Sequence, residues 1–213
     1  MADIVVVDYG MGNLRSVAKA VERVAPDRDV RVSDDPQAVL QAERVVFPGQ
    51  GAMPDCMREL DKRGLRTAVL QAAREKPFLG ICIGLQMLFG RSEEGGAAGL
   101  GILPGRVMRF GAEVLRTDAG GAHLKVPHMG WNTVEPTADH PLWAGLAAGS
   151  HFYFVHSYHV VAGDSALVAA QTPYGALFTS AAVQDNIVAV QFHPEKSAAN
   201  GLKLLENFVG WQP

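Results

Sequence analysis

A cysteine in a Gly-x-Cys-x-Gly pattern constrains the fold of this chain more than any other feature. Cys82 follows the short apolar run 78–81 and precedes a stretch with a helical pattern. Gly80 and Gly84 give the backbone the freedom to turn sharply from strand into helix around the cysteine. The pattern therefore predicts a strand–elbow–helix unit that presents the Cys82 thiol at a helix N-terminus, where free N–H groups and the helix dipole favour the thiolate.

The first half of the chain alternates between short apolar runs and amphipathic stretches, which is the pattern of a parallel α/β sheet. We expect strands at 3–8, 28–32, 44–47 and 78–81, and helices over 13–25, 36–42 and one or two between 52 and 75. Strands and helices in this order place helices on both faces of a mostly parallel sheet. The sequence thus predicts an α/β protein with three layers, α/β/α.

The second half has a different character. Shorter segments with glycine, proline and histidine between 102 and 172 indicate a β-rich, antiparallel excursion. A single strand is expected at 152–160, another at 187–192, and a closing helix over 202–209. Without a linker or an internal repeat, the 213 residues are predicted to form one domain, 1–213.

Composition excludes several classes of protein. The formal net charge of −3 offers no positive field for nucleic acid. No apolar run of about 18 residues predicts a membrane span, and the start of the chain lacks the basic leader of a signal peptide. With Cys56 and Cys82 as its two cysteines, and Cys56 expected in a helix rather than a disulfide, a reactive Cys82 must stay reduced, which indicates the cytoplasm.

A histidine and a carboxylate near the end of the chain complete a covalent catalytic set. His193 and Glu195 follow the late apolar run, with Pro194 stiffening the segment between them. A free thiol has a pKa of about 8.5, and a neighbouring imidazolium lowers it. Cys82 is therefore predicted to be a nucleophile, His193 its base and later acid, and Glu195 the group that orients His193.

Acyl transfer also requires donors for a developing oxyanion. The turn at 48–51 ends a neighbouring strand and contains Gly49, Gln50 and Gly51. Its backbone N–H groups, together with that of Ile83 directly after the nucleophile, are the candidate oxyanion donors.

Nothing in the sequence indicates a metal or a cofactor. The turn at 8–13 lacks the third glycine of a dinucleotide-binding loop, because Arg15 occupies that position. The other histidines show no ligand spacing, and His156 and His159 are expected to flank an edge strand. These other histidines are His123, His128, His140, His151, His156 and His159.

Residues 80–86 together with 193–195 resemble the motifs of the class I, triad-type glutamine amidotransferases. Three further stretches, 8–17, 126–132 and 154–158, resemble those of the glutaminase subunits of imidazole glycerol phosphate synthase, and the resemblance runs nearly end to end. It implies a flavodoxin-like amidotransferase fold and hydrolysis of glutamine to glutamate and ammonia through a γ-glutamyl thioester. The ammonia would pass to a separate cyclase that makes imidazole glycerol phosphate and aminoimidazole carboxamide ribotide in histidine biosynthesis.

The resemblance also implies roles for particular residues. Gln86 would hold the glutamine, Glu94 would contact its α-amino group, and the backbone at Ser157 and Tyr158 would receive its α-carboxylate. The 49–51 turn would be an oxyanion loop that is misoriented until the partner's substrate binds; the family often has valine where this chain has Gln50.

The implied partner is a (β/α)₈ cyclase that forms a heterodimer with this chain and receives ammonia through a shielded route. Four residues match positions that face this partner, and Lys196 among them would pair with an acid near the ammonia entry. The four are Asn13, Trp131, Tyr153 and Lys196.

Three alternatives stay open at this point. The chain could serve another class I amidotransferase pathway, of the anthranilate, GMP or carbamoyl phosphate type, although the stretch 127–132 counts against this. It could be a non-catalytic scaffold, although all three triad residues are present. It could be a cysteine peptidase or another thiol hydrolase, although Glu94, Ser157 and Tyr158 favour a small amino-acid substrate.

Overall fold

The structure is a computed structural model, and it describes residues 2–111 and 124–213. Its strands run in the order β2-β1-β3-β4-β11-β10-β9-β6-β7, with β8 paired to β10 and β5 paired to β8. The strands are β1 (Ile4–Val7), β2 (Val30–Ser33), β3 (Arg44–Gly49), β4 (Phe78–Cys82), β5 (Gly105–Arg109), β6 (His128–Pro136), β7 (Ser150–His156), β8 (Tyr158–Ala162), β9 (Val168–Tyr174), β10 (Ala176–Gln184) and β11 (Ile187–Val190). The α-helices are α1 (Leu14–Val24), α2 (Pro36–Gln41), α3 (Met53–Lys62), α4 (Arg66–Glu75), α5 (Ile83–Leu88) and α6 (Ala198–Gly210), and short 3₁₀ turns are η1 (Pro141–Trp143), η2 (Ser165–Leu167) and η3 (Pro194–Lys196).

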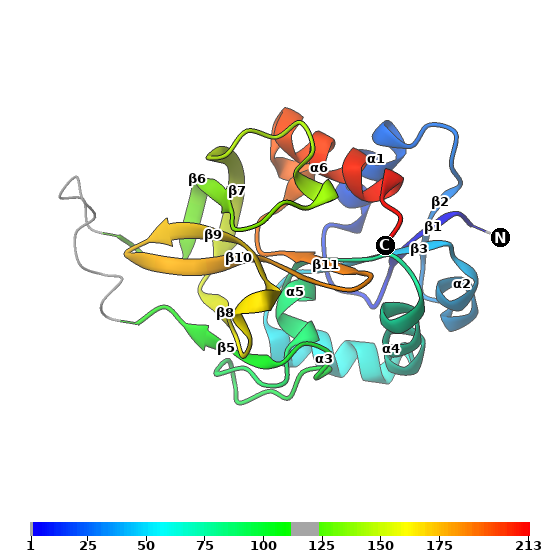
Figure 1. Ribbon diagram of the computed structural model, residues 1–213. Coiled ribbons are helices and arrows are strands. Elements are labelled where there is room, and N and C mark those ends of the chain that lie inside the picture. Colours follow the sequence, from blue (N-terminus) through cyan, green and yellow to red (C-terminus); the bar gives the residue numbers. More distant parts are fainter. Residues whose placement is uncertain (1, 112–123) are drawn as a thin grey trace.

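The first five strands of that order form the parallel part of the sheet. Every residue of β1, β3, β4 and β11 is buried, because helices cover both faces of these strands. Helices α1 and α6 pack together on one side, and α3 and α4 lie on the other (Figure 1). The predicted three-layer α/β/α architecture with a mostly parallel sheet is confirmed.

The second part of the sheet is antiparallel, as the sequence predicted. Strands β9 and β10 form a hairpin, β10 continues onto β11, and β6 pairs with both β7 and β9. These strands extend to the left of the parallel sheet in Figure 1, away from both chain termini. No helix among the described residues is long and apolar enough to cross a membrane.

The expected strand at 152–160 is wrong in one respect. The structure divides it into β7 and β8, with Ser157 between them. β7 pairs with β6, whereas β8 pairs with β5 and β10, so the chain passes from one part of the sheet to another at this residue. No glycine or proline marks the break, and the residues on both sides of it are typical of a strand, so the sequence pattern alone does not reveal it. The closing helix also begins at Ala198, four residues earlier than expected.

Three strand ends bring the predicted site together. In the register between β3 and β4, Gly49 lies opposite Cys82, and β11 pairs with the other side of β4, with Val190 opposite Ile81. Parallel strands present their carboxyl ends at one edge of a sheet, and ligands of open α/β sheets bind outside that edge. Cys82, the 48–51 turn and the segment that leads to His193 therefore meet at one place.

Candidate functional site

Cys82 ends β4 and begins the turn into α5 with a strained backbone. Its φ angle is +56° and its ψ angle −110°, a conformation that side-chain-bearing residues rarely adopt. Glycine at position 84 lets the turn after Cys82 pack closely against β3, because a Cβ at Gly84 would clash with the carbonyl oxygen of Phe47. Cys82 is 3% exposed. Such strain at a nucleophile is expected where the fold must present one side chain at a sharp turn.

His193 and Glu195 lie in the short turn that follows β11. The Nδ1–H of His193 donates to Oε1 of Glu195 over 2.8 Å, and both side chains are buried. This hydrogen bond leaves Nε2 as the ring nitrogen available to a reacting group, and the side chain of His193 interacts with that of Cys82. Pro194 lies at the start of η3, so the spacing of the histidine and the carboxylate is fixed by a rigid turn.

Opposing effects act on the charge of His193. Burial lowers its pKa, but the negative charges of Cys82 and Glu195, and hydrogen bonds to both, outweigh burial and raise the pKa to about 10. The three side chains thus favour the protonated form of His193 beside the Cys82 sulfur. In this form the ring holds a proton for a leaving group.

Two buried side chains fix the 48–51 turn through hydrogen bonds to its backbone carbonyls. The Tyr9 hydroxyl donates to the carbonyl of Pro48 over 2.8 Å, and the Cys56 thiol donates to the carbonyl of Gln50 over 3.3 Å. Gly51 has a φ of +96°, which favours glycine. Gln50, Gly51 and Ile83 border the same cavity as Cys82, whereas Gly49 lies opposite Cys82 in the sheet but does not line the cavity.

A cavity of about 330 Å³ opens at the Cys82 thiol and collects the residues proposed to bind substrate. Gln86, Glu94, Ser157 and Tyr158 all line it. One oxygen of Glu94 accepts a hydrogen bond from the backbone N–H of Met53 over 2.8 Å, at the start of α3. That bond fixes the Glu94 carboxylate at the wall of the cavity. The volume suits a single amino acid better than a peptide.

Gln191 is a site residue that the sequence analysis did not single out. Its Nε2 lies 3.7 Å from the Cys82 sulfur, and its Oε1 accepts from Nε2 of Gln86 over 3.0 Å. Gln86 Nε2 also donates to the Tyr158 carbonyl over 3.0 Å. One feature of the sequence could have identified Gln191: it is a polar residue directly after the all-apolar strand β11 and two residues before His193.

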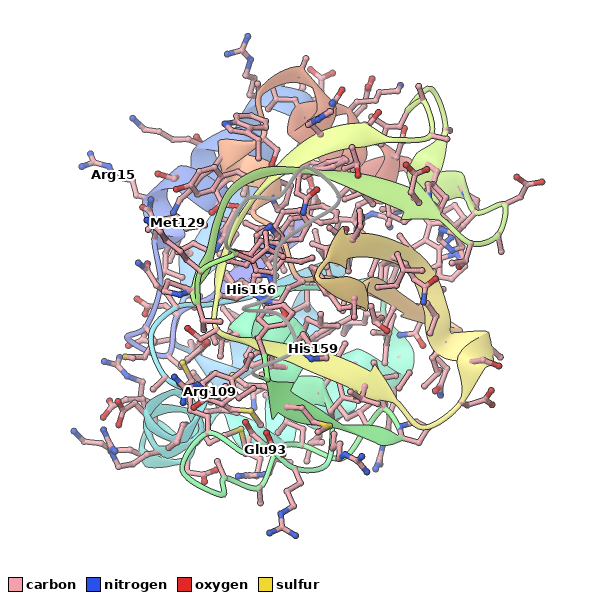
Figure 2. All side chains as sticks on the ribbon, turned by 90° about the vertical axis from the view of Figure 1, so that its left-hand side faces the viewer. Arg15, Glu93, Arg109, Met129, His156 and His159 are labelled. Carbon is pink, nitrogen blue, oxygen red and sulfur yellow. The ribbon has the colours of Figure 1, made fainter. Side chains whose placement is uncertain are left out.

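Three of the four residues expected to face a partner form a row of contacts that reaches the cavity. Trp131 is 53% exposed and packs edge-on against Tyr153, with ring centroids 6.1 Å apart. The Lys196 ammonium lies 5.9 Å from the centre of the Tyr153 ring and lines the cavity. Asn13 is exposed directly before α1. Figure 2 looks onto this side of the molecule, with Met129 and Arg15 near one edge.

The expectation for His156 and His159 is partly wrong. His156 ends the edge strand β7, but His159 lies within β8, which has neighbours on both sides. Among residues 2–111 and 124–213 no cluster of histidine, cysteine and carboxylate side chains could hold a metal ion. His123 lies outside the described residues.

The fold and this arrangement define a class of protein. The model of the family "Glutamine amidotransferase class-I" matches residues 5–210. A crystal structure of a glutamine amidotransferase superposes with a TM-score of 0.69 at 18% identity, covering 97% of this chain and 99% of that one. A second, from Thermotoga maritima, gives 0.59 at 17% identity, with 90% and 75% covered. These two likenesses concern the fold.

Sequence relatives narrow the assignment. The protein named imidazole glycerol phosphate synthase subunit HisH from Aromatoleum aromaticum is 62% identical over the full length of both chains. Its namesake from Dechloromonas aromatica is 63% identical over 210 residues, 99% of this chain and 97% of the relative. The chain therefore belongs to the class-I glutamine amidotransferase family, among the HisH subunits of imidazole glycerol phosphate synthase.

Proposed function

We propose that this chain hydrolyses glutamine in histidine biosynthesis and passes the ammonia to a cyclase subunit that makes imidazole glycerol phosphate and aminoimidazole carboxamide ribotide. The observation that carries the reaction is the alignment of Cys82, His193 and Glu195 at the end of a cavity that suits one amino acid. The pathway follows from the HisH family. The whole chain, 1–213, acts as one glutaminase domain, because the parallel and antiparallel parts share one continuous sheet.

In the first step the Cys82 thiolate attacks the side-chain carbonyl carbon of glutamine. The C=O electrons move onto oxygen, where backbone N–H groups of the 49–51 turn and of Ile83 stabilise the negative charge. The tetrahedral intermediate collapses, and the carbon–nitrogen bond breaks. The His193 imidazolium protonates the leaving nitrogen, so ammonia departs and a γ-glutamyl thioester stays on Cys82.

In the second step water attacks the thioester. His193, now neutral, takes a proton from the water, and the same N–H groups stabilise the second oxyanion. Collapse of that intermediate releases glutamate and restores the thiolate. Glu195 keeps the His193 ring in the tautomer and orientation that both steps require.

Glutamine binding uses the rest of the cavity. The Glu94 carboxylate receives the α-ammonium group of glutamine, the backbone at Ser157 and Tyr158 receives its α-carboxylate, and Gln86 supports that wall. The size of the cavity and the presence of the Glu94 carboxylate in its lining support this assignment.

The partner is a (β/α)₈ cyclase in a heterodimer, docked over Asn13, Trp131, Tyr153 and Lys196. Ammonia at neutral pH is mostly ammonium, which is not a nucleophile, so a closed interface preserves the reactive form. Lys196 lines the cavity, and it would pair with an acid of the cyclase. We place the complex in the cytoplasm, where a reactive thiol stays reduced.

The test is glutamate release from glutamine by the chain alone and with a histidine-pathway cyclase plus its ribotide ligand. We expect weak release from the chain alone, a large rise in the full mixture, and loss of both in Cys82→Ala. Cys82-dependent release that ignores the cyclase would keep the chemistry but assign another amidotransferase pathway. Release that persists in Cys82→Ala would overturn the proposed mechanism.

A further inference from the structure

A continuous series of hydrogen bonds joins β6 to the glutamine cavity. The Asn132 amide lies 3.2 Å from Nε2 of His128, His128 Nδ1 lies 3.0 Å from Nε2 of His156, and His156 Nδ1 lies 2.8 Å from the carbonyl oxygen of Tyr158. That carbonyl also accepts from Gln86, which continues through Gln191 to the Cys82 sulfur. The two histidines at the centre have no role in the reaction described above.

The series fixes the tautomers of both histidines. A carbonyl only accepts, so His156 must carry its proton on Nδ1, which makes its Nε2 an acceptor. His128 then donates from Nδ1, and its Nε2 accepts from the Asn132 amide. The amide orientation is set because Oδ1 of Asn132 accepts from the N–H of Thr133 and its nitrogen donates to the carbonyl of Pro173. Every hydrogen bond of the series has one donor and one acceptor when both rings are neutral. A proton added to Nε2 of His156 would face the Nδ1–H of His128, and a proton added to Nε2 of His128 would face the Asn132 amide N–H.

The surroundings keep the pair neutral. The His128 ring stacks between Tyr174 and Phe154, with centroids 4.0 and 4.7 Å away. Burial lowers the pKa of His128 to about 4, and burial is also the main reason that the pKa of His156 lies well below its usual value. At neutral pH both rings therefore act as fixed hydrogen-bonding groups rather than as proton carriers.

The hydrogen bond from His156 spans the break between β7 and β8. His156 is the last residue of β7 and Tyr158 the first of β8, so the bond ties together the two sides of the kink at Ser157. The carbonyl of Ser157 is held separately by the N–H of Phe110. In Figure 2, His156 lies near the middle of the view, above His159. Both carbonyls of the 157–158 wall are thus anchored away from any ligand.

We propose that His156 and His128 are positioning residues for glutamine: they hold the Tyr158 carbonyl, and with it the kink at Ser157, in the orientation that binds the substrate. The inference rests on the proposed function, because that wall is assigned there to the α-carboxylate of glutamine. His156 acts directly on the wall, and His128 acts by fixing the tautomer of His156.

Glutamine binding tests this role without relying on turnover. In a Cys82→Ala background, which retains bound glutamine unreacted, calorimetry gives the dissociation constant for glutamine. His156→Leu removes the donor to Tyr158, and we expect binding to weaken about tenfold, as for one lost hydrogen bond at a buried site. His156→Asn places an N–H near the position of Nδ1 and should restore most of the affinity. In the active chain the same changes should appear in KM while kcat changes little.

Two further variants separate positioning from general damage. His128→Phe keeps the ring stacking but removes the donor to His156, and we expect a weaker effect in the same direction. His151→Leu changes an exposed histidine at the other end of β7 and should leave glutamine binding unchanged. Each variant is compared by thermal unfolding, and if His156→Leu does not fold, the comparison of His128→Phe with His151→Leu decides the matter.

The outcomes distinguish this inference from the proposed function. Unchanged glutamine affinity in folded His156→Leu and His128→Phe would overturn the positioning role and leave the glutaminase assignment intact. A chain that releases no glutamate with the cyclase would overturn the proposed function. Calorimetry of glutamine binding would still test the positioning role of His156 and His128. Nitrogen NMR of the side chains adds a direct check: His156 protonated on Nε2, or charged at pH 7, would contradict the hydrogen-bond series.

Discussion

At the scale of single residues, the chemistry depends on a few atoms whose surroundings decide their charge. The sequence identified Cys82, His193 and Glu195 because nucleophile, base and orienting acid each follow a strand with a short, recognisable spacing. It did not identify Gln191, because one glutamine after an apolar strand carries no motif. Its place beside Cys82 depends on how β4 and β11 pair, which is a long-range property of the sheet.

Removing the charge of Glu195 should change how activity depends on pH. Negative neighbours raise the pKa of His193 to about 10, and the leaving nitrogen needs the protonated ring. Glu195→Gln removes one of those charges, so the pKa of His193 falls and the alkaline limb of kcat moves to lower pH, by about one to three units. The rate at pH 8 should also fall about a hundredfold or more, because the ring loses its orienting partner. An alkaline limb that stays in place in Glu195→Gln would show that the carboxylate does not set this pKa.

The two thiols should differ sharply in reactivity. Burial raises the pKa of Cys56 to about 11, so about one molecule in a thousand carries the Cys56 thiolate at pH 8. The side chain of Cys56 also has no exposed surface that a reagent could reach. Cys82 borders the cavity beside His193. Iodoacetamide at pH 8 should label Cys56→Ala rapidly and Cys82→Ala slowly, as followed by intact-mass measurement. Equal labelling rates would contradict the assignment of Cys82 as the nucleophile.

At the scale of elements, the strand ends position the site, and the sequence predicted those of β1, β3, β4 and β11 to within one or two residues. Strands β1, β3, β4 and β11 were recognisable because burial on both faces leaves almost no polar positions, the exception being Arg44 at the start of β3. The break at Ser157 was not recognisable. It results from β7 and β8 choosing different partners, and from the His156 side chain bonding across the kink, neither of which leaves a local pattern.

The position of the segment that carries His193 should depend on close packing between α6 and η3 at one glycine. Gly201 faces η3, where an added Cβ would clash with the carbonyl oxygen of Pro194. Gly201→Ala must push η3 away, and such overpacking costs about 1–3 kcal/mol. We expect the melting temperature to fall by about 2–4 °C per kcal/mol, and glutaminase activity to fall with it because His193 moves.

Gly210→Ala is the matched control for that change. It alters a glycine in the same helix that has nothing within 4 Å of an added Cβ. Its melting temperature should stay the same or rise slightly, because alanine reduces the freedom of the unfolded chain. If both variants behaved alike, contact between α6 and η3 would not explain the effect.

At the scale of the whole molecule, the cavity opens beside a surface that a lone protein would not be expected to expose. Four large apolar side chains are markedly exposed among the described residues: Val32, Met129, Trp131 and Leu177. Met129, Trp131 and Leu177 border one hollow next to the glutamine cavity, whereas Val32 lies on β2 at the far end of the sheet. The resemblance had placed Trp131 at the interface. Exposure of its neighbours required the fold, because β6 and the β9–β10 hairpin are far apart in sequence.

Trp131→Ala should weaken assembly with the cyclase while leaving the isolated chain folded. Trp131 is 53% exposed, and tryptophans at the centre of interfaces typically contribute at least 2 kcal/mol, so the dissociation constant of the complex should rise about thirtyfold or more. Val32→Ala removes a comparably exposed side chain at the other end of the sheet and should leave assembly unchanged. Calorimetric titration of each variant with the cyclase measures both effects, and melting temperatures near that of the unaltered chain are expected for both. Equal affinities for the two variants would place the partner on a different face, and the route for ammonia would then have to leave the cavity away from Lys196.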